Sequence, residues 1–301
     1  MKATGPMRQP LAQALAARMV LLDGGLSNQL EAQGCDLSDE LWSARLLADG
    51  PGQIEAAHAA YIRAGAEVLI TASYQASYAG FARRGISRAE TARLLRESVA
   101  LARRAAGDRA WVAASVGPYG AVLADGSEYR GRYGLSVADL TAFHRPRVAA
   151  LAAAEPDVLA LETVPDATEA EALLRAAEGT GLPVWLSYTI AGGRTRAGQD
   201  LAEAFAVAAG HPQVIAAGVN CCAPQDVQEA VEVAHAVTGL PAVAYPNSGE
   251  DWDAAAGVWR GGGSYAPELA AGWRKAGARL IGGCCRVGPG EIAALGHTLD
   301  S

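Results

Sequence analysis

The sequence has none of the long apolar runs that mark membrane and secreted proteins. Among its 301 residues, no stretch of about 18 apolar residues occurs without a charge or a turn signal, so a membrane-spanning helix is not expected. The first ten residues also lack the apolar core of a signal peptide. These absences predict a cytoplasmic protein whose cysteines are reduced.

Several catalytic residue types are scarce or poorly placed. Only Lys2 and Lys275 supply an amine, and neither follows an apolar run, which weighs against a Schiff-base aldolase. The five histidines form no HxH or HExxH pattern, so a histidine-bound metal hydrolase is disfavoured. The glycine-rich stretches Gly192–Gly193 and Gly261–Gly263 lack the spacing of a phosphate-binding loop and are interpreted as turns.

Clustered positive charge is missing as well. The formal net charge is -7, the pI is near 5.3, and no basic run is present, which argues against a nucleic-acid partner. Half of the residues are hydrophobic, enough to offset the entropy of ordering the chain. We expect a monomer or small homo-oligomer that binds small molecules, with no nucleic-acid or membrane partner; the acidity suits a cationic ligand.

Eight short apolar or β-branched runs recur, separated by alanine-rich segments with helical periodicity such as residues 89–106 and 226–237. Eight strand-helix units without a break in composition predict one α/β domain, a (β/α)8 TIM barrel, with a doubly wound open sheet as the alternative. The expected strands are Val20–Asp23, Val68–Ser73, Trp111–Gly117, Val158–Thr163, Val184–Thr189, Val214–Asn220, Ala242–Asn247 and Arg279–Cys284.

The first three units are longer than a minimal unit, which predicts elaborated loops over the mouth in the N-terminal half. One of these segments, Tyr119–Gly134, is rich in glycine and tyrosine and is either a lid or a solvated loop. Leu11–Arg18 is expected to form a helix across the barrel floor. Residues 1–10 are expected to be a mobile segment and residues 11–301 to be the barrel domain.

Four of the five cysteines stand in two adjacent pairs, Cys221-Cys222 and Cys284-Cys285, at the ends of the sixth and eighth predicted strands. Chemistry in such a barrel gathers at the carboxyl ends of the strands, so three of these thiols are able to meet at the mouth. Three thiolates suit Zn²⁺ and leave a fourth position for substrate. Adjacent residues of a strand point to opposite faces, so Cys284 and Cys285 can both bind the metal only if the strand ends before them. Gly282 and Gly283 would permit the chain to bend at that point. Buried, unreactive cysteines are the alternative.

At these positions the chain resembles the zinc-dependent homocysteine S-methyltransferases, in particular the stand-alone enzymes that use S-methylmethionine. The resemblance extends from residue 21 to residue 285. Its motifs are LLDGG (21–25), TASYQA (71–76), SVGPYG (115–120), LETVP (161–165), GVNC (218–221), YPNSGE (245–250) and GGCC (282–285).

The resemblance implies one zinc ion held by Cys221, Cys284 and Cys285, with Cys222 a neighbour that does not bind it. It implies that homocysteine, bound to zinc as a thiolate, attacks the methyl group of a sulfonium donor and yields methionine. The donor is S-methylmethionine or S-adenosylmethionine; the sequence leaves this choice and the oligomeric state open. Glu162 is the expected partner of the homocysteine ammonium, which its own apolar surroundings also favour.

Further contacts are expected around these groups. Asp23 is a candidate for orienting the ammonium, and the N–H groups of Gly24 and Gly25 for binding the carboxylate. The aromatic rings of Trp42, Tyr74 and Tyr119 are candidates for receiving the sulfonium cation. By resemblance alone, Asn247 and Ser248 contact the donor or the homocysteine chain.

Two other functions remain open at this point. A homocysteine methyltransferase could take its methyl group from betaine or a methylfolate, although no segment is left for a cobalamin or folate domain. A non-enzymatic scaffold could use the cysteine pairs only to bind zinc or to oxidise. A scaffold predicts that homocysteine leaves the metal environment unchanged, whereas a homocysteine methyltransferase predicts that homocysteine changes it.

Overall fold

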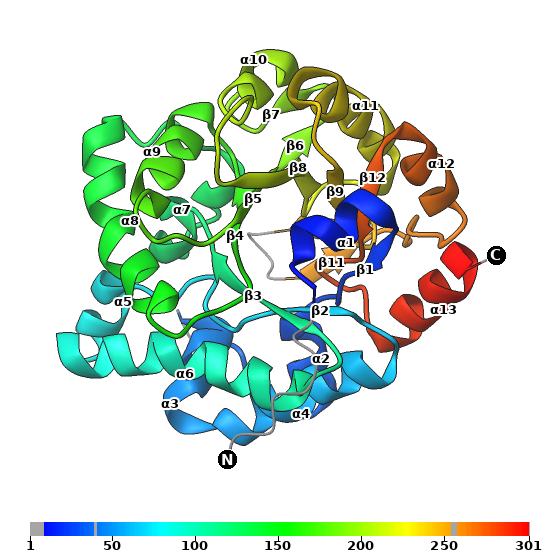
Figure 1. Cartoon of the computed structure of the whole chain (residues 1–301). Helices are drawn as coiled ribbons and strands as arrows, with labels where there is room; N and C mark the ends of the chain where they lie inside the picture. Colours follow the sequence, from blue (N-terminus) through cyan, green and yellow to red (C-terminus); the bar gives the residue numbers. More distant parts are fainter. Residues whose placement is uncertain (1–8, 39–40, 254–257, 301) are drawn as a thin grey trace.

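Eight parallel strands close into a barrel in the computed structural model, which describes residues 9–38, 41–253 and 258–300. Their order is β1-β12-β9-β8-β5-β4-β3-β2, and a parallel bridge between Leu22 and Val68 joins the two ends of the sheet. Each strand overlaps one predicted run, which confirms the TIM barrel (Figure 1). The strands are β1 (Val20–Leu21), β2 (Val68–Ile70), β3 (Trp111–Val116), β4 (Val158–Val164), β5 (Val184–Tyr188), β8 (Val214–Asn220), β9 (Ala242–Tyr245) and β12 (Ala278–Ile281).

One helix follows each strand and covers the outside of the barrel (Figure 1). Serine caps begin two of the longest: Ser87 accepts a hydrogen bond from Glu90, and Ser136 forms a capping box with Asp139. The helices are α4 (Pro51–Arg63), α6 (Arg88–Ala106), α8 (Val137–Ala152), α9 (Ala167–Ala177), α10 (Leu201–Ala206), α11 (Val227–Thr238), α12 (Leu269–Ala276) and α13 (Pro289–Asp300).

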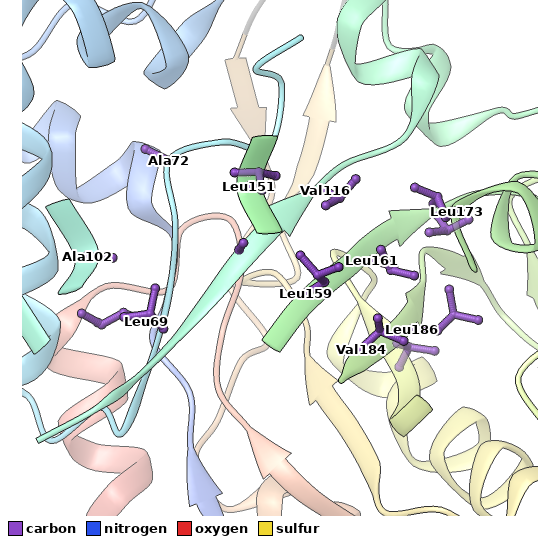
Figure 2. Packing of buried hydrophobic residues seen from close by; sticks show 14 of the residues in the cluster. Leu69, Ala72, Ala102, Val116, Leu151, Leu159, Leu161, Leu173, Val184 and Leu186 are labelled. Carbon is purple, nitrogen blue, oxygen red and sulfur yellow. The ribbon is translucent and has the colours of Figure 1, made fainter. Parts of the chain in front are cut away.

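Two apolar layers hold the barrel together. The outer layer packs strands against helices: Leu159 and Leu161 of β4 lie beside Leu173 of α9 (Figure 2). The inner layer fills the barrel with side chains that include Trp111 and Trp185. This alternation follows from the two-residue period of a strand, and it leaves only the two ends of the barrel accessible.

The floor of the barrel is closed as predicted. Helix α1 (Leu11–Ala17) lies across the barrel axis (Figure 1), and its Leu11 and Leu15 side chains join the inner apolar layer. Met1–Arg8, most of the segment expected to be mobile, are outside the described residues. Among the described helices, none combines the length and the hydropathy needed to cross a bilayer. With its floor filled, the barrel offers its mouth as the place for a site.

The loops at the mouth are elaborated in the N-terminal half, as expected. Short helices occupy the connections after the first three strands; these are α2 (Leu26–Ala32), η1 (Trp42–Arg45), α3 (Leu46–Asp49), α5 (Tyr78–Arg83), α7 (Tyr119–Leu123) and η2 (Ser127–Tyr129).

Elements that the sequence analysis missed lie in the other half: the hairpins β6 (Ile190–Ala191) with β7 (Arg194–Thr195) and β10 (Asp251–Asp253) with β11 (Val258–Arg260), and η3 (Pro224–Asp226). Hairpin strands of two or three residues are too short to show a periodicity.

One buried histidine makes the stability of this fold depend on pH. His58 of α4 is fully buried, and neither ring nitrogen has a hydrogen-bond partner among the described residues. Burial lowers the pKa of His58 from 6.5 to about 4. Between these values the unfolded chain binds a proton that the folded chain excludes, so stability falls as the pH falls from 6.5 to 4.

We therefore expect the His58→Leu variant to lose part of this pH dependence. His58 accounts for about 2 kcal/mol of the decrease in unfolding free energy between pH 7 and pH 5. Denaturant unfolding of both proteins at the two pH values measures the difference. Equal decreases in the two proteins would mean that the folded chain protonates His58 as readily as the unfolded chain does.

Candidate metal and substrate site

Three thiols meet at the mouth of the barrel. The Sγ atom of Cys285 lies 3.6 Å from that of Cys221 and 4.0 Å from that of Cys284, and all three sulfur atoms lie within 4.8 Å of one another. These separations exceed a disulfide bond, whose sulfur atoms are about 2.05 Å apart. Ligands placed about 2.3 Å from a tetrahedral zinc ion are separated by roughly 3.8 Å. The donor set therefore fits a three-cysteine metal site with a fourth position open.

Strand β8 delivers Cys221 to this site through an unusual backbone conformation. Cys221 follows the last residue of the strand and has a positive φ of 50°. Its N–H donates to the carbonyl of Tyr245, and its own carbonyl accepts a hydrogen bond from Thr189. This left-handed turn sends Cys221 to the mouth and Cys222 into the outer apolar layer, where burial raises the Cys222 pKa.

The second pair is displayed differently. Strand β12 ends at Ile281, three residues earlier than expected, so Cys284 and Cys285 lie in a loop and both face the site. Gly283 is needed there for space, because a Cβ atom would lie 2.2 Å from Val287. The N–H of Cys284 donates to the carbonyl of Pro246, which ties this loop to the end of β9. The bend before the cysteine pair is confirmed, but its cause is close packing.

The remaining cysteines are separate from the cluster. Cys222 and the half-buried Cys35 are not among the grouped thiols. Within the cluster, hydrogen bonds from the Cys284 and Cys285 thiols lower the pKa of Cys221. The phenol of Tyr129 lies a further 3.2 Å from Cys221 Sγ. A thiolate at Cys221 is thus stabilised before any ion is considered.

A buried carboxylate lies beside the thiols. Glu162 of β4 accepts hydrogen bonds from the hydroxyls of Ser115 and Tyr245, the latter at 3.1 Å. Thr163 next to it has a positive φ of 56° at an irregularity between β4 and β5, which turns Glu162 toward the barrel mouth. Burial is the main cause that raises the Glu162 pKa, to about 7. A cation in the cavity would stabilise this carboxylate.

Asp23 adds a second acidic group. One of its oxygens accepts from the N–H of Ile70 at 2.9 Å, and the other is buried without a partner. Burial, followed by the neighbouring charge of Glu162, raises the pKa of Asp23. The N–H of Gly25 already donates to the carbonyl of Val287, so of the two expected glycine N–H groups only that of Gly24 stays a candidate for a carboxylate.

The three thiols and Glu162 line one cavity of about 120 Å³, whereas Asp23, an expected contact, is not part of its lining. It is bounded by the cysteine cluster together with Gly24, Gly25, Tyr74, Tyr129, Glu162 and Tyr245. Tyr129 was not predicted individually, but it belongs to the Tyr119–Gly134 segment. That segment is not a solvated loop, because Ser127 and Glu128 of η2 are buried and Tyr129 contacts Cys221.

Other expected residues lie outside this cavity lining. Tyr119 packs against Tyr133 and Phe143. The hydroxyl of Ser248 donates to Glu250, and its N–H donates to the carbonyl of Cys285. Asn247 accepts from Gly249 within the same turn. The structure therefore places Asn247 and Ser248 in the loop that supports Cys285. The Trp42 side chain is outside the described part of the chain.

The fold and the site define a (β/α)8-barrel protein with a cluster of three cysteines at its mouth that could hold a metal ion. The family model for homocysteine S-methyltransferase matches residues 20–299. The chain is 47% identical to the homocysteine S-methyltransferase of Escherichia coli, over 92% of this chain and 94% of that protein. It is 42% identical to the homocysteine S-methyltransferase YbgG of Bacillus subtilis, over 94% and 96% of the two chains.

The solved structures agree with this match. The metallated form of the Escherichia coli homocysteine methyltransferase MmuM superposes with a TM-score of 0.87 at 44% identity, covering 97% of this chain and all of that one. The chain belongs to the homocysteine S-methyltransferase family and is a methyltransferase.

Proposed function

We propose that this protein transfers a methyl group from a sulfonium amino acid to homocysteine, with Zn²⁺ held by Cys221, Cys284 and Cys285. The observation that carries the proposal is the set of three thiols at tetrahedral ligand spacing, in one cavity with the buried carboxylate of Glu162. The family supplies homocysteine as the acceptor.

The metal accounts for activation of the acceptor. A free thiol has a pKa near 8.5 and is only a few per cent thiolate at neutral pH. A zinc ion bound here would lower the pKa of a coordinated thiol so that it is deprotonated at neutral pH. The cysteines leave the fourth position to the substrate, because three protein ligands are present in the cluster. No general base is required from the protein.

The carboxylates account for orientation. Glu162, which lines the cavity, pairs with the ammonium of homocysteine. Asp23 lies behind the lining residue Gly24 in the chain, and its buried, unpaired oxygen is the candidate for a second partner. The N–H of Gly24 faces the same cavity as a donor for the carboxylate. Holding both ends of the amino acid keeps its sulfur in line with the incoming methyl group.

The methyl donor is a cation in this proposal, S-methylmethionine or S-adenosylmethionine. The homocysteine sulfur forms a bond to the methyl carbon as the bond to the sulfonium sulfur breaks, with the electron pair leaving on that sulfur. A thiolate and a sulfonium become two neutral thioethers, so charge is neutralised in the step. Tyr74 and Tyr129 present aromatic surface to the cavity for the cation.

Zinc absorption spectroscopy tests the acceptor half of the proposal. Addition of homocysteine to the zinc-loaded protein is expected to change the metal environment from three to four sulfur ligands. A donor assay with S-methylmethionine, S-adenosylmethionine, betaine and a methylfolate tests the other half, with turnover expected only for the sulfonium compounds. An unchanged zinc spectrum would support a scaffold, and turnover of betaine would support the other enzyme class.

The proposed chemistry also bears on the cellular location of the protein and on the extent of its functional domain. Reduced thiols are needed at the metal site, which supports a cytoplasmic location. The described residues from Leu11 onward build the barrel and its loops, so we propose residues 11–301 as the functional domain.

A further inference from the structure

We infer that Arg196 forms a carboxylate subsite for the methyl donor at the rim of the barrel mouth. This inference rests on the proposed function, because it concerns the second substrate of the same site. Arg196 follows β7 in the hairpin after β5, and it is half-buried. Its guanidinium carbon lies 5.4 Å from the centre of the Tyr129 ring.

The stacking places a positive charge one tyrosine ring away from the metal ligands. The hydroxyl of Tyr129 lies 3.2 Å from Cys221 Sγ. The guanidinium of Arg196 lies over the face of the same ring in a cation–π contact. A guanidinium within about 6 Å of an aromatic ring is attracted to its face. Tyr129 lines the cavity and Arg196 does not, so Arg196 lies just outside the cavity, against a ring that lines it.

The guanidinium has no acidic partner among the residues that the structure describes. Its Nε atom is buried and has no hydrogen-bond partner among those residues. Burying a guanidinium atom without a partner is costly, and arginine is well suited to bind a carboxylate through two parallel hydrogen bonds. The missing partner is thus expected to be a carboxylate that arrives with a ligand.

Further positive charge surrounds this position, although the chain is acidic overall. Arg194 donates to the carbonyl of Gly198, and the Arg132 guanidinium lies beside the same glycine. Gly131 and Ala197 pack together, so the segment that carries Tyr129 and the hairpin that carries Arg196 are in contact. Asp166 also lies here and accepts a hydrogen bond from the N–H of Arg132, so the guanidinium of Arg196 is the group proposed to receive the anion, whereas Glu162 inside the cavity attracts cations.

Position in the barrel separates this subsite from the one proposed for homocysteine. The order of the closed sheet puts β5 four strands from β1 in either direction, so the two strands lie opposite each other. Gly24 follows β1, whereas Arg196 follows β5. The carboxylate held at Arg196 therefore belongs to the other substrate. In a sulfonium amino acid this carboxylate is linked to the reacting sulfur through three carbon atoms.

Donor kinetics with a matched pair of substrates test this subsite. We expect Arg196→Gln to raise the KM for S-methylmethionine about 10- to 100-fold, the range for loss of charge-assisted hydrogen bonds. The KM for homocysteine and kcat are expected to stay within about twofold, since the barrier after binding does not involve this contact. S-methylmethionine amide, which lacks the carboxylate, is expected to react equally with both proteins.

Two further variants complete the design. Arg196→Lys keeps the charge without the planar fork and is expected to fall between the two proteins. Arg109→Gln removes an exposed guanidinium just before β3, at the end of the barrel opposite the mouth, and is the control for overall charge. Calorimetric binding of S-methylmethionine to the zinc-loaded protein gives a second reading that does not require turnover.

The outcomes are distinct. An unchanged donor KM in Arg196→Gln overturns the subsite while leaving the proposed function intact. Equal losses with S-methylmethionine and its amide also overturn it, because Arg196 would then act only by supporting Tyr129. A wild-type protein that neither binds nor uses a sulfonium amino acid overturns both proposals.

Discussion

Replacing Cys284 with alanine is expected to abolish stoichiometric zinc binding and to lower methyl transfer by more than about a hundredfold. Loss of groups that only support a metal ligand costs about 10- to 100-fold, and loss of a ligand itself costs more. The sulfur of Cys284 lies 4.0 Å from that of Cys285, so its removal leaves two thiols where three are needed. Metal analysis and an activity assay on the same sample measure both effects.

The chain contains matched controls for this substitution. Cys222→Ala and Cys35→Ala each remove a thiol that lies outside the cluster, so both are expected to retain zinc and activity. Treatment of the wild type with a chelator is expected to remove activity, and added zinc to restore it. Full activity in a zinc-free Cys284→Ala protein would contradict the proposed role of the metal.

Glu162→Gln is expected to raise the KM for homocysteine about 100-fold or more. The glutamine keeps the size of the side chain but loses the charge that pairs with the substrate ammonium. Removing one partner of a buried ion pair costs about 3–5 kcal/mol, which corresponds to a factor of about 160 to several thousand. Zinc content is expected to stay near that of the wild type, since Glu162 is not among the clustered ligands. Steady-state kinetics with varied homocysteine measure the change.

Ser115→Ala provides a graded comparison for that result. It removes one of the two hydroxyl donors to Glu162 while leaving the carboxylate in place. A smaller increase in the KM for homocysteine is expected, because a single hydrogen bond to a charged group is worth about 1.5–3 kcal/mol. An unchanged homocysteine KM in Glu162→Gln would place the substrate ammonium elsewhere, with the unpaired oxygen of Asp23 as the next position to test.

The strands and the cysteine cluster illustrate what local sequence signals reveal. Each buried strand is a short apolar run, because a strand covered on both faces needs apolar side chains at successive positions. The cysteine pairs follow two such runs, and strand ends gather at one end of a barrel. Identity of residues and order along the chain were sufficient for these predictions.

Tyr129, Ser115 and Gly25 illustrate what those signals do not reveal. Tyr129 reaches Cys221 from a loop 92 positions earlier in the chain. Ser115 holds Glu162 from the neighbouring strand, a contact set by the register of β3 and β4. The N–H of Gly25 is engaged by Val287 near the other end of the chain. Each contact depends on how distant segments pack, and no local pattern encodes it.

By itself, the sequence predicted the eight-unit barrel and a cluster of thiols drawn from its two cysteine pairs, because both depend on side-chain type at the ends of apolar runs. Only the tertiary structure decided how Cys221 and Cys222 divide between the mouth and the apolar layer, since that depends on the positive φ of Cys221. Only the tertiary structure brought Arg196 against Tyr129, because two loops without regular periodicity meet there. Packing between distant segments, rather than composition, set these positions.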